Sequence, residues 1–303
     1  MMISQNQMVN SNSILTLTEI EKLATDMLKA KSMSDLPPIG DTWLGDPSSD
    51  YGLVLVHGFT GTNLEMLYLG NFMAARGFRV FVPLLPGHGT DKQDLSRTSY
   101  MDWVSKVKSS VNQLLQEKDG RRVILGGHSL GGSMVILVSL EFPSIKGLIL
   151  LATPIRYSIF RRIVMRLLAK TRLSLRYDQF AFHDKKLFQN PYVKFLGKRY
   201  KYLDYKSVNE AYKLLGDAYE LLDSTRLPVL MIYSLQDHRV SKFQGREMYN
   251  RLSSRNKRIV WLENSDHVVV FDSDKKLVAK EVDRFSQSLM KLVDFSASSS
   301  RAS

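Results

Sequence analysis

The sequence predicts an α/β fold with a doubly wound, mostly parallel sheet. Six short apolar runs are continuous rather than alternating, as is typical of strands that helices cover on both faces. Stretches with helical periodicity separate these runs, and that alternation favours a parallel sheet with crossover helices. One run leads directly into a corner rich in glycine and serine, Gly126–Ser133, where such sheets gather reactive groups.

The first 48 residues form a separate predicted segment. Residues 1–13 are polar and are expected to be irregular. A helix is predicted over 14–30, because its apolar positions share one helical face. These positions are Leu17, Ile20, Leu23, Ala24, Met27 and Leu28. We expect this helix to dock on the main body, with a membrane or partner helix as the alternative.

The main body begins after a connector marked by Pro37, Pro38 and Gly40. The predicted strands are 52–56, 79–83, 122–125, 147–151, 228–233 and 258–262. The predicted helices are 63–76, 99–117, 130–141, 241–252 and 274–292.

The alternation of strands and helices stops between residues 155 and 222. The gap between the fourth and fifth predicted strands is too long for an ordinary connection. We therefore predict an inserted cap subdomain, 155–222, on a core formed by 49–154 and 223–293. The serine-rich end, 294–303, is predicted to be a disordered tail.

Positive charge is concentrated in the insertion. The chain has 42 Lys and Arg against 30 Asp and Glu, a formal net charge of +12. Residues 155–206 hold 14 of the Lys and Arg and three Asp, so the rest is nearly neutral. The run Tyr200–Tyr205 mixes aromatic and charged residues, but no binding fold accompanies it. Nucleic acid is therefore not an expected partner.

Composition limits the class of protein. A hydrophobic content of 44% fits a soluble globular protein with a sizeable core. No run of 18 apolar residues and no secretory signal is evident, so a cytoplasmic location is expected. The lack of cysteine excludes disulfides, thiolate metal sites and cysteine nucleophiles. The sequence gives no indication of oligomeric state.

Ser129 is the candidate nucleophile. It lies in Gly127-His-Ser-Leu-Gly131, a G-x-S-x-G motif between a predicted strand and a predicted helix. In such a nucleophile elbow the serine occupies a strained turn, and its neighbours two residues away must be small. Gly127 and Gly131 meet this requirement. A purely structural turn is the alternative.

A serine hydroxyl needs a base, and histidine is suited to this near neutral pH. His267 follows the last predicted strand and is the candidate. The other histidines fit less well: His57 and His88 are expected to shape loops, His128 lies inside the elbow, His183 lies in the insertion and His238 lies beside an Asp.

An acid should orient the imidazole of His267. Asp237 follows the strand 228–233 and is the candidate, whereas Asp266 and Asp272 share the histidine's own loop and are expected to cap or carry surface charge. The chain order Ser, Asp, His is that of the α/β-hydrolases. An oxyanion hole is predicted from the backbone N–H groups of Leu130 and Phe59.

Together, these motifs resemble those of the bacterial carboxylesterases and monoacylglycerol lipases of the α/β-hydrolase superfamily. The matching stretches are His57–Gly61, Pro86–Gly89, Asp102–Trp103, Gly127–Gly132, Gln236–Asp237 and Glu263–Val268. The resemblance covers about residues 51–293. The first 45 or so residues have no counterpart in the compact members, and the positive charge of the cap is unusual for them.

The resemblance implies an α/β-hydrolase fold in which 155–222 caps the pocket. It implies hydrolysis of carboxylic esters through an acyl-enzyme, without metal or organic cofactor. The expected substrate is a small acyl ester, monoacylglycerol-like or with a short or medium acyl chain. A thioesterase or acyltransferase with the same residues is one alternative, and His267–Asp272 spells an H-x4-D pattern seen in acyltransferases. A non-catalytic binding protein is the other.

One predicted cap helix is amphipathic. Its apolar stripe is Phe160, Ile163, Val164, Leu167 and Leu168, and its basic residues are Arg161, Arg162, Arg166 and Lys170. Such a helix is typical of peripheral contact with an anionic membrane. Alternatively, the stripe covers the acyl pocket and the arginines face water.

Overall fold

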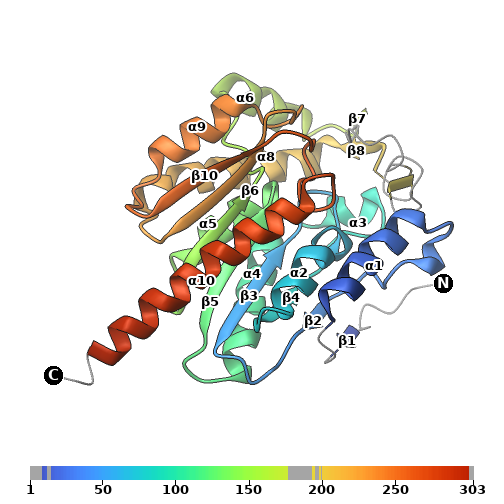
Figure 1. Ribbon diagram of the computed structural model, residues 1–303. Coiled ribbons are helices and arrows are strands. Elements are labelled where there is room, and N and C mark those ends of the chain that lie inside the picture. The colour runs from blue at the N-terminus through green and yellow to red at the C-terminus, as the bar shows by residue number, and fades with distance from the viewer. Residues whose placement is uncertain (1–8, 12–14, 177–192, 195–197, 199, 300–303) are drawn as a thin grey trace.

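The computed structural model describes residues 9–11, 15–176, 193–194, 198 and 200–299. An eight-stranded sheet runs through the molecule with helices against both faces (Figure 1). Its strand order is β1-β2-β4-β3-β5-β6-β9-β10. The strands are β1 Val9–Ser11, β2 Thr42–Leu44, β3 Tyr51–Val56, β4 Arg79–Val82, β5 Arg122–His128, β6 Ile145–Leu151, β9 Val229–Ser234 and β10 Lys257–Leu262.

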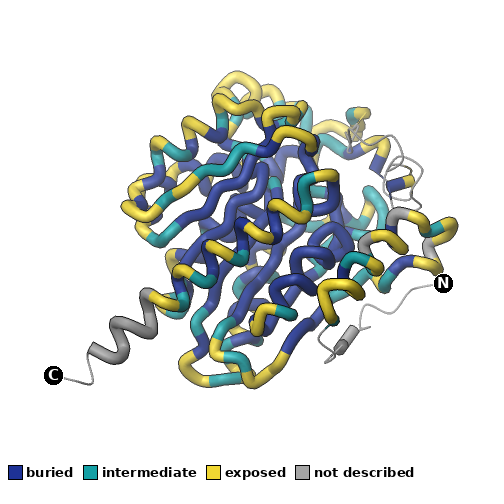
Figure 2. The backbone as a smooth tube through the Cα atoms, viewed as in Figure 1, coloured by how far each residue is buried: buried dark blue, intermediate teal, exposed yellow. Residues whose placement is uncertain are grey.

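The six strands predicted from apolar runs are all present. Strands β4, β3, β5, β6, β9 and β10 lie side by side and parallel, so the predicted fold class is confirmed. Every residue of β9 and all but the first of β3 are buried (Figure 2). Burial on both faces of the sheet explains why these strands show no polar alternation.

Strands β1 and β2 have no counterpart in the sequence prediction. Strand β2 pairs antiparallel with β4, and β1 pairs parallel with β2. Each has three residues, which is too short for a periodic pattern. The expectation of irregular chain over 1–13 is therefore wrong at Val9–Ser11.

Helices cover both faces of the sheet. Helices α2 and α10 contact each other in front of the sheet in Figure 1, and α4 and α5 contact each other behind it. The helices are α1 Leu17–Lys29, α2 Leu67–Ala74, α3 Lys92–Arg97, α4 Tyr100–Glu117, α5 Leu130–Ser139, α6 Ile159–Leu168, α8 Tyr205–Glu220, α9 Lys242–Arg251 and α10 Lys275–Ser299. Helices α3 and α8 have no counterpart in the sequence prediction. The expectation of disorder from residue 294 is not met, because α10 continues to Ser299.

Helix α1 packs against α2. Thr16 and Glu19 form a capping box at its start, which satisfies backbone N–H groups that the helix leaves unpaired. Ile20 and Met27 are buried in the core. The Tyr68 hydroxyl of α2 donates a 2.8 Å hydrogen bond to Glu21. Within the described ranges, no helix is long and apolar enough to cross a bilayer.

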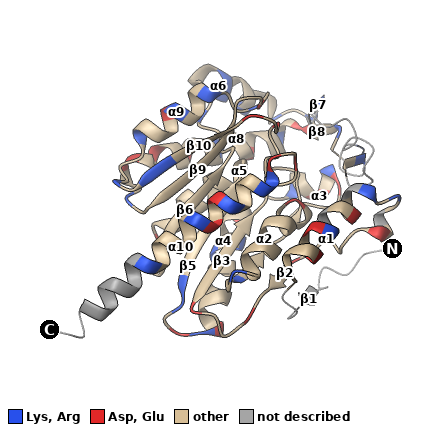
Figure 3. Cartoon of the chain, viewed as in Figure 1, with Lys and Arg blue, Asp and Glu red and all other residues tan. Residues whose placement is uncertain are grey.

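The chain between β6 and β9 builds a layer above the sheet. It contains α6, α8, the 3₁₀ turn Leu222–Ser224 and a two-stranded antiparallel sheet of β7 (Ser174–Arg176) and β8 (Tyr202–Asp204). Helix α8 contacts both α6 and α5, so the layer lies next to the helix that follows Ser129. Figure 3 shows basic residues gathered on α6. The proposed cap boundaries, 155 and 222, stay a prediction.

Candidate active site

Ser129 lies in a sharp turn between β5 and α5. Its backbone has φ 51° and ψ −119°, a left-handed conformation that is strained for a residue with a side chain. The turn leaves no space for a side chain at Gly127 or Gly131. A Cβ added to Gly127 would lie 2.3 Å from the carbonyl carbon of Gly131, and a Cβ added to Gly131 would lie 2.4 Å from the backbone oxygen of Val56. The Ser129 N–H donates to Leu151 O at 2.7 Å, which ties the turn to β6.

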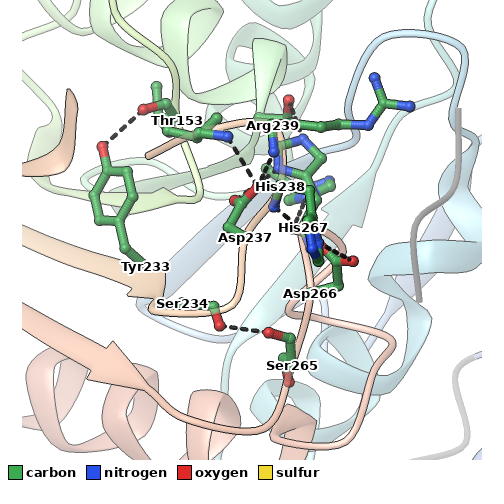
Figure 4. Close-up of polar contacts among 12 residues, drawn as sticks. Thr153, Tyr233, Ser234, Asp237, His238, Arg239, Ser265, Asp266 and His267 are labelled. Atoms are coloured by element: carbon green, nitrogen blue, oxygen red, sulfur yellow. Dashed lines mark hydrogen bonds and ion pairs between the residues drawn. The ribbon is translucent and has the colours of Figure 1, made fainter. Parts of the chain in front are cut away.

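The structure brings Ser129, His267 and Asp237 together from three separate loops. His267 Nε2 lies 2.8 Å from Ser129 Oγ, and His267 Nδ1 lies 2.9 Å from Asp237 Oδ2. Figure 4 shows Asp237 and His267 facing each other above the carboxyl ends of the strands. Asp237 Oδ1 accepts the backbone N–H groups of Arg239 and Val240, at 2.7 and 2.9 Å. These bonds hold the carboxylate in the orientation in which its other oxygen faces the imidazole.

Burial and hydrogen bonding determine the protonation states of His267 and Asp237. Burial lowers the pKa of His267 despite the opposing effect of Asp237, so the ring is neutral at neutral pH. Burial alone would raise the pKa of Asp237, but the hydrogen bond from His267 and the two backbone donors hold it below its usual range. A neutral imidazole against an ionised carboxylate can accept the proton of the Ser129 hydroxyl.

The loop after β3 lies against the serine. A Cβ on Gly58 would lie 3.3 Å from Ser129 Cβ, so Phe59 follows a residue in contact with the turn. Leu130 is the first residue of α5, and its N–H has no acceptor within the helix. The positions of these two residues suit the predicted oxyanion hole, and their role stays a prediction.

The competing histidines have other contacts. His57 Nδ1 donates to Gly58 O and its Nε2 accepts the N–H of Leu85, and burial lowers its pKa. His88 bonds to Pro86 O, and burial lowers its pKa to about 3. His238 bonds to Asp266, 2.9 Å away. His183 lies outside the described residues.

The competing acids are also accounted for. Asp266 accepts the backbone N–H of His267 at 2.7 Å, and Asp272 accepts the backbone N–H of Asp266 at 2.7 Å. Both carboxylates therefore brace the loop that carries His267. The Ser234 hydroxyl adds a further brace by donating to the carbonyl of Ser265 (Figure 4).

Glu65 is a site residue that the sequence analysis missed. It is 2% exposed and accepts hydrogen bonds from Gly58 N and His128 Nδ1. The available signal was an acidic residue within an otherwise apolar run, Leu64–Leu69. Among the described residues, no three His, Asp or Glu side chains are grouped so that they could hold a metal ion.

Comparison with known proteins decides the family. A model of the serine aminopeptidase S33 family matches residues 48–274. The chain belongs to this family. The match covers the Ser129 turn, Asp237 and His267, and begins just after the N-terminal segment that carries α1.

Relatives of this S33-family chain include lipolytic enzymes. The thermostable monoacylglycerol lipase of Bacillus sp. (strain H-257) is 31% identical over 227 residues, which cover 75% of this chain and 86% of the relative. The carboxylesterase of Bacillus subtilis (strain 168) is 23% identical over 240 residues, which cover 79% of this chain and 94% of the relative. A solved structure from a study of two metagenome-derived lipolytic enzymes has a TM-score of 0.73 at 24% identity, and the match covers 84% of this chain and 99% of that one. The chain is an enzyme, a serine hydrolase of the α/β-hydrolase fold.

Proposed function

We propose that this enzyme hydrolyses carboxylic esters with Ser129 as nucleophile, His267 as general base and Asp237 as the acid that orients the base. The observation that carries the proposal is the continuous contact from Asp237 through His267 to Ser129, at 2.9 and 2.8 Å. The expected oxyanion donors are the N–H groups of Phe59 and Leu130.

The reaction follows from this arrangement. Ser129 Oγ attacks the ester carbonyl carbon while His267 Nε2 takes the hydroxyl proton, and the carbonyl oxygen becomes an oxyanion. When the bond to the alcohol breaks, His267 returns the proton to the departing oxygen. Water then attacks the acyl-enzyme with the same base, which releases the carboxylic acid and restores the Ser129 hydroxyl.

The proposed substrate is a monoacylglycerol-like ester or another ester with a short or medium acyl chain. Two named relatives support this choice, a monoacylglycerol lipase and a carboxylesterase. The H-x4-D pattern gives no support to the acyltransferase alternative. The Asp272 carboxylate accepts the backbone N–H groups of Asp266 and Ser273, so it braces the loop.

The proposal is tested by turnover and covalent labelling together. We expect hydrolysis of p-nitrophenyl butyrate and of monoacylglycerols, with acyl-CoA hydrolysed at least about tenfold more slowly. A fluorophosphonate should label the peptide that contains Ser129, because an activated serine attacks such a phosphorus centre. Labelling without ester turnover, or acyl-CoA as the best substrate, would contradict ester hydrolysis.

The cap supports a second part of the proposal, contact with an anionic membrane surface. No residue of α6 is buried, and Phe160 and Leu167 are 72% and 59% exposed. This exposure supports the interfacial interpretation over the one in which the stripe covers the acyl pocket. Arg161 and Arg166 are also exposed on α6. Apolar side chains beside arginines match the interfacial helices that insert among anionic lipid headgroups.

Vesicle binding tests this contact. The enzyme should sediment with phosphatidylglycerol vesicles and not with pure phosphatidylcholine vesicles. Replacing Phe160 and Leu167 with Asp should weaken that binding at least about tenfold, because apolar area that enters the bilayer is lost. Turnover of p-nitrophenyl butyrate should stay within about twofold.

A matched control is Met101→Asp on α4, where the side chain is 50% exposed. This variant should bind vesicles like the parent enzyme. Equal loss of binding in Met101→Asp, or full binding by the α6 variant, would remove α6 as the membrane contact.

A further inference from the structure

A buried ion pair, Glu65 and His128, lies directly beneath the loops of the site. Glu65 Oε1 and His128 Nδ1 are 2.9 Å apart, and each side chain is 3% exposed. Glu65 comes from the 3₁₀ turn Asn63–Met66 before α2, whereas His128 ends β5. The family chemistry described above uses neither residue.

The Glu65–His128 pair contacts three segments of the proposed active site. Glu65 Oε1 accepts the N–H of Gly58 at 2.7 Å, and Gly58 precedes Phe59. His128 precedes Ser129 in the chain. His128 Nε2 lies 2.9 Å from the backbone oxygen of His267. The pair therefore contacts the predicted oxyanion loop, the nucleophile turn and the segment that carries the base.

These contacts favour a positive charge on His128. A backbone oxygen only accepts hydrogen bonds, so Nε2 carries a proton. Nδ1 faces a carboxylate oxygen, and it donates when that carboxylate is ionised. Burial opposes a charge on His128, but Glu65 raises its pKa above the usual value, and His128 in turn lowers the pKa of Glu65 against the same burial. Both pKa shifts favour an imidazolium that faces a carboxylate.

We propose that Glu65 and His128 are positioning residues, which hold the oxyanion loop and the main chain of His267 in fixed register with Ser129. This inference rests on the proposed function, because the pair has a positioning role only if those three segments take part in catalysis. Misplacement of reacting groups by about 1 Å can cost about 100-fold in rate, so a buried charged brace at this point has a large effect.

The imidazolium also acts on the base through its charge. The rings of His128 and His267 lie 5.1 Å apart. Other ionisable groups around His267 come from the loop after β9 and from its own loop, and they are Asp237, His238, Arg239, Asp266 and Asp272. The positive charge of His128 adds to the effect of burial and lowers the pKa of His267.

The sign of the pH effect follows. The base works in its neutral form, so kcat/KM falls as the pH drops through the pKa of His267. Removing the neighbouring positive charge raises that pKa. The acidic limb of the pH profile then moves to higher pH.

Glu65→Gln tests the inference. Its amide has nearly the same shape and removes the negative charge that stabilises a charged His128. Because Glu65 Oε1 meets both Gly58 N–H and His128 Nδ1, an amide NH₂ at that position can donate to a neutral His128 only by giving up the bond from Gly58. For p-nitrophenyl butyrate we expect kcat to fall about tenfold or more, with KM within about threefold, and the acidic limb of kcat/KM to move up by at least half a pH unit. The parent enzyme and Ser129→Ala are measured alongside.

The matched control is Glu117→Gln. Glu117 bonds to the guanidinium groups of Arg79 and Arg121 near the amino ends of β4 and β5, at the opposite edge of the sheet. This variant breaks a largely buried ion pair that does not touch the site. Its kcat and its acidic limb should match those of the parent enzyme.

The outcomes separate cleanly. A Glu65→Gln enzyme with parental kcat, or with an unmoved acidic limb, overturns the inference while ester hydrolysis by Ser129 stands. A parent enzyme without turnover, or an active Ser129→Ala, overturns the proposed function itself. If Glu65→Gln does not fold, Glu65→Gln combined with His128→Gln leaves no charge at these two positions, and the same loss of kcat and shift of the limb are expected.

Discussion

Ser129→Ala is expected to lower kcat/KM for p-nitrophenyl butyrate by about 10⁴- to 10⁶-fold. The change removes the oxygen that would form the acyl-enzyme, and water has no comparable position against His267. The fold should tolerate it, because alanine and serine meet the same backbone strain at φ 51° and the smaller side chain enters no new space. Steady-state rates and the thermal midpoint of both proteins check this result.

Ser139→Ala is the matched control for this variant. Ser139 is buried on the same helix, α5, and its hydroxyl donates to Ile136 O at 2.8 Å. Its loss should change turnover by less than about threefold, since it lies in the last turn of the helix. Comparable losses in the two variants would mean that damage to α5, and not the missing nucleophile, accounts for the effect.

Asp237→Asn is expected to lower kcat by about 10⁴-fold with little change in KM. The amide oxygen can keep the backbone bonds from Arg239 and Val240. The NH₂ group then faces His267 Nδ1 and donates to it, which places the ring proton on Nε2. That nitrogen can no longer accept a proton from Ser129.

Asp266→Asn separates this effect from a general loss of negative charge. Asp266 lies on the same loop as His267, and its amide replacement can still accept the backbone N–H of His267. We expect kcat within about tenfold of the parent enzyme. A larger loss in Asp266→Asn than in Asp237→Asn would transfer the orienting role to Asp266.

Sequence patterns predicted the central sheet because burial on both faces imposes an unbroken apolar run on each strand. They predicted the positions of Ser129, Asp237 and His267 because each follows a strand at the same edge of a parallel sheet. Strand β2 escaped prediction for the opposite reason. Its three residues are specified by pairing with β4, and no local pattern records that pairing.

Two features needed the tertiary structure. Periodicity predicted an amphipathic helix near Phe160, but it could not say whether the apolar side faces the pocket or the solvent. Glu65 resembles any acidic residue near a helix start until His128, 63 residues later, supplies its partner. Buried charged residues are thus the site residues that are hardest to predict from sequence, because the partner that stabilises each charge is distant in the chain.

The pairing of β6 with β9 has a consequence for how this enzyme can be altered. Leu148 pairs with Val229 and Leu151 with Ile232, so the long segment between them leaves and re-enters at adjacent strands. Because the two strands are parallel, the segment leaves at the carboxyl end of β6 and re-enters at the amino end of β9, so a replacement must be long enough to span the sheet from one edge to the other. Any exchange of the layer above the sheet therefore has to preserve this crossover, and a short loop cannot take its place.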